Sequence, residues 1–416
     1  MQNSGKRWFI AVMATLVHLF LGTVYAWSFF QGKVTETFGW SNSETAWTFS
    51  IAIFMLGITA SWGGINLPKY GSRKLALIGS VLYSLGYIIS YFALKNESLP
   101  LLYFGYGIVG GIGLGLAYVT PVAVASKWFP DKQGLVTGMV VMGFGLGALL
   151  MAKLLAPVFL NYFENSLPKT FLAIGIIMLV FLPLFANFLS MPVQEKTAEV
   201  TDEKVNALPE IFSKNFIFIW IMFTFAVIAG MIFISFQSPL LQDLLKAGGL
   251  TDQLTLEHKG ATLIALSALF NGLGRFVWGS ASDKLGRINT FRILLIVEAL
   301  VFAGLIFTKN PMIFSVGVCI VLLNYGGAFG VIPSLVKESY GAKLMATMYG
   351  VALTAWGVGG ILGPQITAYM KDHFGAEAGT NSFMVALVLI LIGIMLTFFV
   401  KNDKKVVYSA QCYFSK

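Results

Sequence analysis

The stretch Ala261–Ser282 reads ATLIALSALFNGLGRFVWGSAS, and one charged residue, Arg275, lies among its aliphatic, aromatic and small residues. As a helix, a run of this length crosses about 30 Å of hydrocarbon. A guanidinium keeps its proton, so an arginine at this depth costs several kcal/mol unless water, protein or an anion compensates its charge. The stretch therefore predicts a membrane helix whose arginine binds an anionic ligand.

Similar apolar runs recur along the whole chain. Of its 416 residues, 57% are hydrophobic and only 11% are charged, too few to cover the surface of a soluble domain of this size. Because lipid offers no partner to free backbone groups, the spans are expected to be helices. The sequence predicts an all-α membrane protein with twelve transmembrane helices. Their expected ranges are 8–30, 43–66, 74–94, 100–126, 133–160, 168–190, 214–242, 258–281, 290–308, 311–336, 345–370 and 381–400.

Basic residues distinguish the two sides of the membrane. The termini and the connections after even-numbered spans hold more Lys and Arg than the odd-numbered connections, which predicts that both termini are cytoplasmic. The odd-numbered connections hold Lys33, Lys95, Lys169, Lys246, Lys259, Lys309 and Lys371. The other side holds Lys69, Arg73, Lys74, Lys127, Lys132, Lys284, Arg287, Lys337, Lys343, Lys401, Lys404 and Lys405, among others. Basic cytoplasmic loops also explain the net charge of +9, and no nucleic-acid partner is expected.

Two further features narrow the class of protein. No small-residue cleavage pattern follows the first hydrophobic run, Trp8–Phe30, so we expect a retained span rather than a signal peptide. The two cysteines, Cys319 and Cys412, lie far apart in the chain, which indicates neither a disulfide framework nor a metal site. No cofactor is expected.

The second half of the chain repeats the first. Residues 212 apart match: Trp8 with Trp220, Gly115 with Gly327, Pro121 with Pro333, Gly138 with Gly350, Phe144 with Trp356, Gly145 with Gly357, and Gly147 with Gly359. This constant offset predicts two pseudo-symmetric six-helix bundles, at 1–191 and 214–401. The hydrophilic composition of 192–213 predicts a cytoplasmic linker between them, and 402–416 is expected to be a cytoplasmic tail.

The connection between the eighth and ninth spans reads GSASDKLGR at 279–287. With this signature and two parallel six-helix repeats, the chain resembles the major facilitator superfamily, which implies the major facilitator fold. The resemblance implies that the signature forms a cytoplasmic gate. The expected gate residues are Gly279, Asp283, Gly286 and Arg287. The matching segment between spans two and three, GINLPKYGSR at 64–73, keeps the glycines but has Pro68 where the signature has Asp.

Two other segments narrow the resemblance, namely KWFPDKQGL at 127–135 and LFNGLGRFVWG at 269–279. They are similar to the bacterial oxalate–formate antiporter family, which is related to the monocarboxylate transporters. In that family's oxalate transporter, an Arg in span eight and a Lys in span eleven hold the two carboxylates. Arg275 matches the Arg, whereas Trp356 stands at the position of the Lys. Monocarboxylate transporters have an Asp linked to proton coupling four residues before the Arg, where this chain has Asn271.

The expected substrate site surrounds Arg275, whose planar fork suits a carboxylate through two charge-assisted hydrogen bonds. Asn271 lies one turn before Arg275 on the same face of the helix. It either takes part in the substrate site or holds neighbouring helices together. Trp356 either forms a wall of the site or packs within its glycine-rich helix. Three tyrosine hydroxyls are candidate donors to the substrate, against the ordinary alternative of core packing. These tyrosines are Tyr118, Tyr325 and Tyr25.

Two embedded ionisable residues are candidate proton carriers, Glu298 in the ninth span and His18 in the first. Each has a structural alternative, because Glu298 could neutralise Arg275 and His18 could be a hydrogen-bonded residue of the bundle. A third alternative is that the transported acid itself carries the proton.

These features predict a secondary active transporter of small monocarboxylates of the lactate, pyruvate or formate type, working by alternating access. Proton symport is the expected mode of transport. The alternative is exchange of one carboxylate for a counter-anion, as in oxalate–formate exchange. We expect a monomer in lipid, in a bacterial-type inner (cell) membrane. The sequence has no nucleotide loop, nucleophile elbow or His/Cys cluster, so an enzyme is not expected. A non-transporting sensor is an alternative from another class, although 402–416 is short for a signalling extension.

Overall fold

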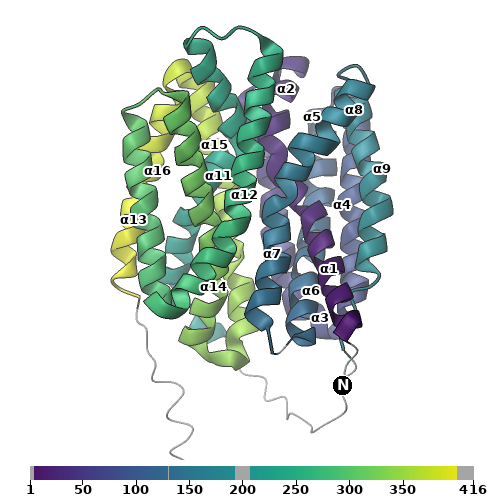
Figure 1. Cartoon of the computed structure of the whole chain (residues 1–416), viewed down its shortest axis with the longest axis vertical. Coiled ribbons are helices and arrows are strands. Elements are labelled where there is room, and N and C mark those ends of the chain that lie inside the picture. The colour runs from purple at the N-terminus through teal and green to yellow at the C-terminus, as the bar shows by residue number, and fades with distance from the viewer. Residues whose placement is uncertain (1–3, 130, 193–206, 401–416) are drawn as a thin grey trace, which may run out of the picture.

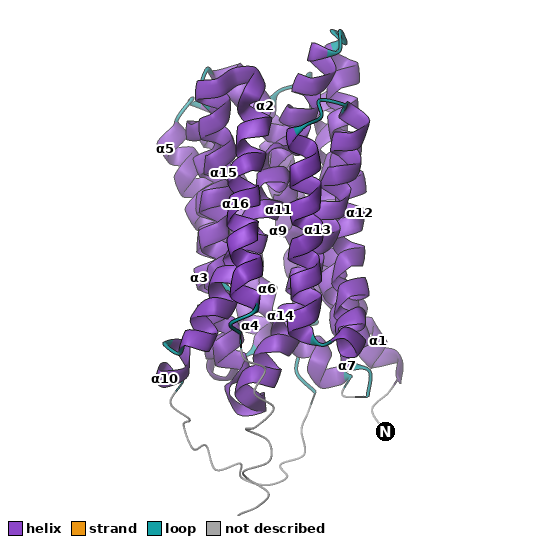
Figure 2. Cartoon of the chain, turned by 90° about the vertical axis from the view of Figure 1, so that its left-hand side faces the viewer, coloured by secondary structure: helices purple, strands orange, loops and turns teal. Residues whose placement is uncertain are grey.

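The computed structural model describes residues 4–129, 131–192 and 207–400, and every element in those ranges is a helix (Figures 1 and 2). Eleven helical stretches in this part of the chain are long and apolar enough to cross a membrane. The last of them, Thr347–Thr397, contains both α15 and α16, which gives the twelve crossings expected from the sequence. The prediction of an all-α membrane protein is confirmed.

The N-terminal half, residues 4–192, contributes six crossings. Several crossings are divided by a short 3-10 or π-helical segment, labelled η, where the backbone departs from regular α geometry. The elements are α1 (Ser4–Leu21), η1 (Gly22–Ala26), α2 (Trp27–Phe38), α3 (Asn42–Tyr70), α4 (Ser72–Lys95), α5 (Leu99–Leu102), η2 (Tyr103–Gly110), α6 (Gly111–Trp128), α7 (Gln133–Leu150), η3 (Met151–Leu155), α8 (Ala156–Tyr162) and α9 (Leu167–Ala186).

The C-terminal half, residues 207–400, contributes the other six. Its elements are α10 (Leu208–Ile211), α11 (Lys214–Ala247), α12 (Gln253–Leu285), α13 (Arg287–Ile306), α14 (Pro311–Ala352), α15 (Thr354–Phe374), η4 (Gly375–Glu377) and α16 (Ala378–Thr397). The expected linker at 192–213 is helical at Leu208–Ile211. Most of that linker and the expected tail at 402–416 lie outside the described residues.

The backbone breaks where the sequence predicts a connection between the spans at 311–336 and 345–370. The label α14 covers two helices that meet at a kink. Gly341 lies at the kink with φ 79° and ψ 167°, a non-helical conformation that only glycine adopts easily. The predicted break between the two spans is therefore present.

The largest contacts between the two halves are those of two helix pairs, α7 with α12 and α3 with α15. At their centres the backbones come close together. A Cβ on Gly145 would lie 2.7 Å from Gly272 Cα, and one on Gly57 would lie 2.8 Å from the Gly357 nitrogen. Gly145 and Gly357 are also partners in the sequence repeat, so the two contacts are pseudo-equivalent. Small residues allow such close packing, which positions any site between the halves.

Polar contacts join the halves at the end of the molecule opposite the N-terminus, the upper end in Figure 1. Asp372 at the end of α15 accepts hydrogen bonds from the backbone N–H groups of Asn42 (2.9 Å) and Ser43 (2.8 Å), and from both side chains. These N–H groups begin α3, where a helix has free donors and a positive partial charge. Lys33 Nζ lies 2.5 Å from Glu257 Oε2 across the same boundary.

Candidate functional site

Arg275 lies on α12 at the boundary between the two halves, and its residue is only 3% exposed. The guanidinium carbon lies 5.7 Å from the ring centre of Phe144 on α7 and 5.2 Å from that of Phe329 on α14. One ring therefore comes from each half. Such cation–π contacts compensate part of the buried charge, but they leave the N–H donors unused.

Four of the predicted residues complete an aromatic cage around Arg275. Tyr118 and Trp356 pack edge to face with ring centres 5.1 Å apart. The Tyr25 hydroxyl from η1 lies 2.6 Å from the Tyr325 hydroxyl on α14, a hydrogen bond that joins the halves. We call the six rings of Tyr25, Tyr118, Phe144, Tyr325, Phe329 and Trp356 the aromatic cage.

The guanidinium has no hydrogen-bond partner of normal geometry among the described residues, although Nε, Nη1 and Nη2 are all buried. The Tyr118 hydroxyl lies close enough to the guanidinium for a weak hydrogen-bond interaction, and the hydroxyls of Tyr25 and Tyr325 interact with it electrostatically. Buried polar groups in proteins are normally paired, and an unpaired buried cation is among the most costly exceptions. An anion placed in the cage would supply the missing acceptors.

Asn271 lies beside α14. Its Oδ1 has no hydrogen-bond partner within the described residues, and a Cβ on Gly326 of α14 would lie 2.9 Å from it. The side chain therefore packs at the contact between α12 and α14. This position agrees with the interhelical alternative, and no hydrogen bond joins Asn271 to Arg275.

Glu298 is buried on α13, and no ion pair with Arg275 is present. Its helix packs on α12, α14 and α16, all in the C-terminal half. Neither carboxyl oxygen has a hydrogen-bond partner in the described ranges. The structure thus separates Glu298 from the cage, and the neutralising role considered from the sequence is not realised.

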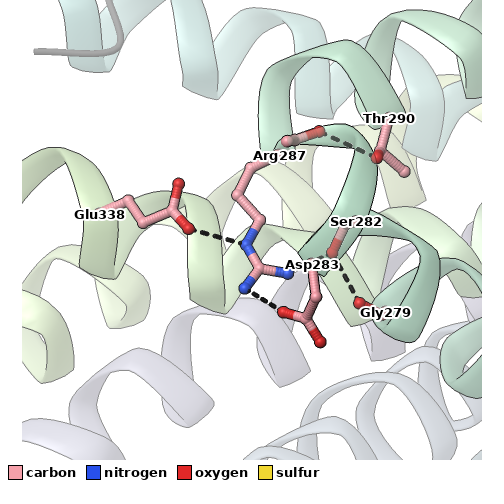
Figure 3. Close-up of polar contacts among 7 residues, drawn as sticks. Gly279, Ser282, Asp283, Arg287, Thr290 and Glu338 are labelled. Carbon is pink, nitrogen blue, oxygen red and sulfur yellow. Dashed lines mark hydrogen bonds and ion pairs between the residues drawn. The ribbon is translucent and has the colours of Figure 1, made fainter. Parts of the chain in front are cut away.

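The predicted gate residues form a compact cluster at the lower end (Figure 3). Arg287 donates from Nη2 to Asp283 (2.5 Å) and from Nε to Glu338 of α14 (3.0 Å). Arg287 also donates to Ser282, whose hydroxyl donates to the Gly279 carbonyl at 2.6 Å. Gly286, with φ 82°, makes the turn that brings α13 back beside α12. All these contacts lie within the C-terminal half.

Sequence reasoning missed Phe144, Phe329 and Glu338. The chain has 36 phenylalanines, so no single one stands out. The available signal was the repeat, which pairs Phe144 with Trp356. For Glu338 the only signal was an acidic residue close after Pro333 at the lower end of its span.

A cavity of about 170 Å³ lies at the upper end between the halves, apart from the cage. Its lining includes Lys33, Asp243, Glu257 and Lys371, while neither Arg275 nor any residue of the cage lines it. Lys371 pairs with Asp243 within the C-terminal half.

The model of the Major Facilitator Superfamily matches residues 8–364 of this sequence. The chain belongs to this superfamily. It is a multi-pass membrane transporter and not an enzyme. Among solved structures, a bacterial homolog of the human lysosomal transporter Spinster, inward-facing and unoccupied, superposes with a TM-score of 0.71 at 16% identity, covering 96% of this chain and 97% of that one. The nucleoside transporter NupG superposes with a TM-score of 0.67 at 14% identity, and the match covers 95% of this chain and 98% of that one. At these identities the two structures show the shared fold alone.

Curated relatives of this transporter cover nearly the whole chain. The oxalate:formate antiporter of Oxalobacter formigenes is 27% identical over 95% of this chain and 92% of its own length. Human monocarboxylate transporter 11 is 25% identical over 94% of this chain and 82% of its own length. Apicoplast pyruvate carrier 1 of Toxoplasma gondii is 24% identical over 82% of this chain and 71% of its own length. These matches confirm the resemblance read from the sequence.

Proposed function

We propose that this transporter carries small monocarboxylates of the lactate, pyruvate or formate type through the aromatic cage. The observation that carries the proposal is the buried guanidinium of Arg275 at the boundary between the halves, which has no acceptor of normal hydrogen-bond geometry among the described residues. A carboxylate would accept two of its N–H groups in the bidentate geometry that arginine favours. The names of the three relatives, all transporters of small carboxylates by their descriptions, support the same substrate class.

The cage favours one carboxylate with a short tail. Among the described residues, Arg275 is the single cation that faces the six rings, and Trp356 occupies the position where a second cation would be needed for a dicarboxylate. Burying a second carboxylate against indole and phenyl rings would leave its charge unpaired. An aliphatic tail would instead gain apolar contact.

Alternating access would expose the cage to each side in turn. The excess of basic residues at the lower end supports a cytoplasmic position for that end, in a bacterial-type inner membrane. The clamp of Asp372 on α3 and the Lys33–Glu257 pair then close the outer side. Among the described residues, no polar contact between halves is recorded at the lower end, so opening towards the cytoplasm breaks fewer bonds.

Proton coupling is the expected mode of transport. Asn271 cannot carry a proton, so the simplest arrangement is that the substrate brings its own. The anion neutralises Arg275, and protonation of the bound acid permits its release in neutral form. Oxalate–formate exchange is the second candidate, supported by the antiporter among the relatives.

Uptake into proteoliposomes tests the proposal. The panel contains labelled lactate, pyruvate, formate, acetate and oxalate, each with and without an inward proton gradient. We expect uptake of at least one monocarboxylate, accelerated by the gradient, with oxalate taken up poorly. Uptake of oxalate in exchange for formate, without any effect of the gradient, would favour the second candidate. An absence of counterflow with every acid would contradict carboxylate transport itself.

A further inference from the structure

His18 lies behind the aromatic cage and is joined to one of its rings. The residue is fully buried on α1, and its Nε2 lies 2.8 Å from the backbone carbonyl oxygen of Tyr118 on α6. A carbonyl only accepts, so Nε2 is the donor in this bond. The imidazole also stacks on the Tyr118 ring, with centres 4.8 Å apart and planes 16° from parallel. One side chain thus holds both the backbone and the ring of Tyr118.

The carbonyl that His18 contacts lies in a turn of α6 next to a proline. Pro121 lies inside the helix and has no N–H, so the carbonyl of Ala117 loses its helical donor. The Thr120 hydroxyl donates to that carbonyl at 3.0 Å instead. The next carbonyl, that of Tyr118, has the N–H of Val122 as its helical donor and accepts from His18 with its second lone pair.

Tyr118 is also one of the six residues of the aromatic cage. Its ring packs at 5.1 Å on both Phe144 and Trp356, and its hydroxyl faces the guanidinium of Arg275. His18 itself contacts Phe144 edge to face at 5.9 Å. The Nδ1 side of its ring faces the Val140 carbonyl of α7 without a hydrogen bond of normal geometry. His18 therefore lies between the two helices that supply the N-terminal half's walls.

We propose that His18 is a positioning residue of the substrate site, which fixes the Tyr118 ring and hydroxyl against Arg275 through its Nε2–H bond and its stacking contact. The inference rests on the proposed function, because it assumes that the cage binds the carried anion. It assigns His18 a role as a hydrogen-bond donor to Tyr118 and removes it from the two proton-carrier candidates. Tyr118 is the residue through which it acts.

Three substitutions of His18 distinguish its possible roles as a hydrogen-bond donor, as a stacking ring and as a proton carrier. His18→Gln keeps an N–H donor and cannot bind a proton near neutral pH. His18→Phe keeps a ring that can stack but has no donor, and His18→Leu has neither. The measurements are KM and maximal rate of uptake for an acid that the unmodified protein carries, with and without an inward proton gradient. Melting temperature and yield in detergent report whether each variant folds.

We expect His18→Gln to keep KM within about 3-fold and to keep the acceleration by the proton gradient. His18→Leu should raise KM about 5- to 10-fold, as expected for about 1 to 1.5 kcal/mol from one buried hydrogen bond. His18→Phe should lie between the two. The maximal rate should stay within about 2-fold in all three, because the bond orders the site without taking part in the conformational change.

A double-mutant cycle with Tyr118→Ala tests whether His18 acts through that residue. Once the Tyr118 ring is gone, His18→Leu should change KM by less than about 2-fold, since little remains to position. An undiminished effect of His18→Leu in the Tyr118→Ala protein would overturn the inference. Loss of gradient-driven uptake in His18→Gln with counterflow preserved would also overturn it, and would make His18 a proton carrier. If the unmodified protein carries no acid of the panel, the proposed function fails first and this inference with it.

Discussion

At the scale of single residues, the site is built around an incomplete set of interactions. Arg275 lies over two aromatic rings, and none of its three buried nitrogens has an acceptor of normal hydrogen-bond geometry within the described chain. The rings reduce the cost of burying the charge, while the free donors leave the substrate as the missing partner. In the proposed function, these unused donors are the source of the affinity of the cage for an anion.

Replacing Trp356 by lysine should change the preferred substrate. Trp356 is fully buried against Phe329 at 4.8 Å, and Trp356→Lys would place a second cation beside the cage. We expect oxalate to compete about 10-fold better against a labelled monocarboxylate than it does in the unmodified protein, because its second carboxylate gains a partner. Trp356→Phe is the matched control and should leave oxalate a poor competitor. Strong competition by oxalate in the unmodified protein would contradict the account of specificity.

Glu298 should be dispensable for coupling. Its helix contacts only other helices of the C-terminal half, and its carboxyl has no described partner in the cage. Glu298→Gln keeps the shape of the side chain without an acidic proton. We expect this variant to retain acceleration of uptake by an inward proton gradient. Loss of the acceleration with counterflow intact would identify Glu298 as the proton carrier and remove the model of a substrate-borne proton.

At the scale of elements, the sequence predicted the helices and the depth of Arg275 because hydrophobic length and a lone charge are local signals. It also predicted that Tyr25, Tyr118, Tyr325 and Trp356 lie together around Arg275. The signal was that each is an aromatic residue with a polar group in a central span. The sequence left two positions open for the side chain of Asn271, since its packing beside Gly326 depends on how α12 and α14 are placed together. The angle between the two parts of α14 at Gly341 likewise depends on tertiary packing, which the sequence permits without specifying.

Adding one methyl group where α7 meets α12 should stop transport. A Cβ on Gly145 would lie 2.7 Å from backbone atoms of Gly272, so Gly145→Ala must push the halves apart. We expect it to lower counterflow strongly and to cost about 1 to 3 kcal/mol of stability, as overpacking of close contacts does. Gly304→Ala on α13 is the control, because a Cβ there meets nothing within 4 Å. Equal counterflow in the two variants would show that the close contact is not needed.

At the scale of the whole molecule, most of the described polar contacts between the halves lie at the upper end of their boundary. Asp372 of the C-terminal half accepts four hydrogen bonds from the first two residues of α3 in the N-terminal half. The Arg287 cluster at the lower end stays within one half and stiffens the turn between α12 and α13. Opening of the upper end must therefore release Asp372, whereas the cluster can move as a unit.

Removing the clamp should favour the outward-open state. In an Asp372→Ala protein, a cysteine placed at Ser28, which is 1% exposed and borders the upper cavity, should react at least about 5-fold faster with an impermeant thiol reagent. The background has Cys319 and Cys412 replaced. Asp243→Asn is the control, because Asp243 pairs with Lys371 inside the C-terminal half. The same increase in both variants would indicate general loosening rather than release of a clamp.

Equilibrium binding of the labelled acid to purified Arg275 variants tests the central claim most directly. Arg292→Lys serves as control, since Arg292 donates to Thr397 at 2.9 Å on the far side of the C-terminal half. We predict that Arg275→Ala weakens binding about 30-fold or more, corresponding to about 2 kcal/mol for lost charge-assisted hydrogen bonds. Arg275→Lys should also weaken it about 10-fold, because an ammonium lacks the bidentate fork, whereas Arg292→Lys should bind normally. Unchanged affinity in a well-folded Arg275→Ala protein would contradict the claim that Arg275 binds the substrate.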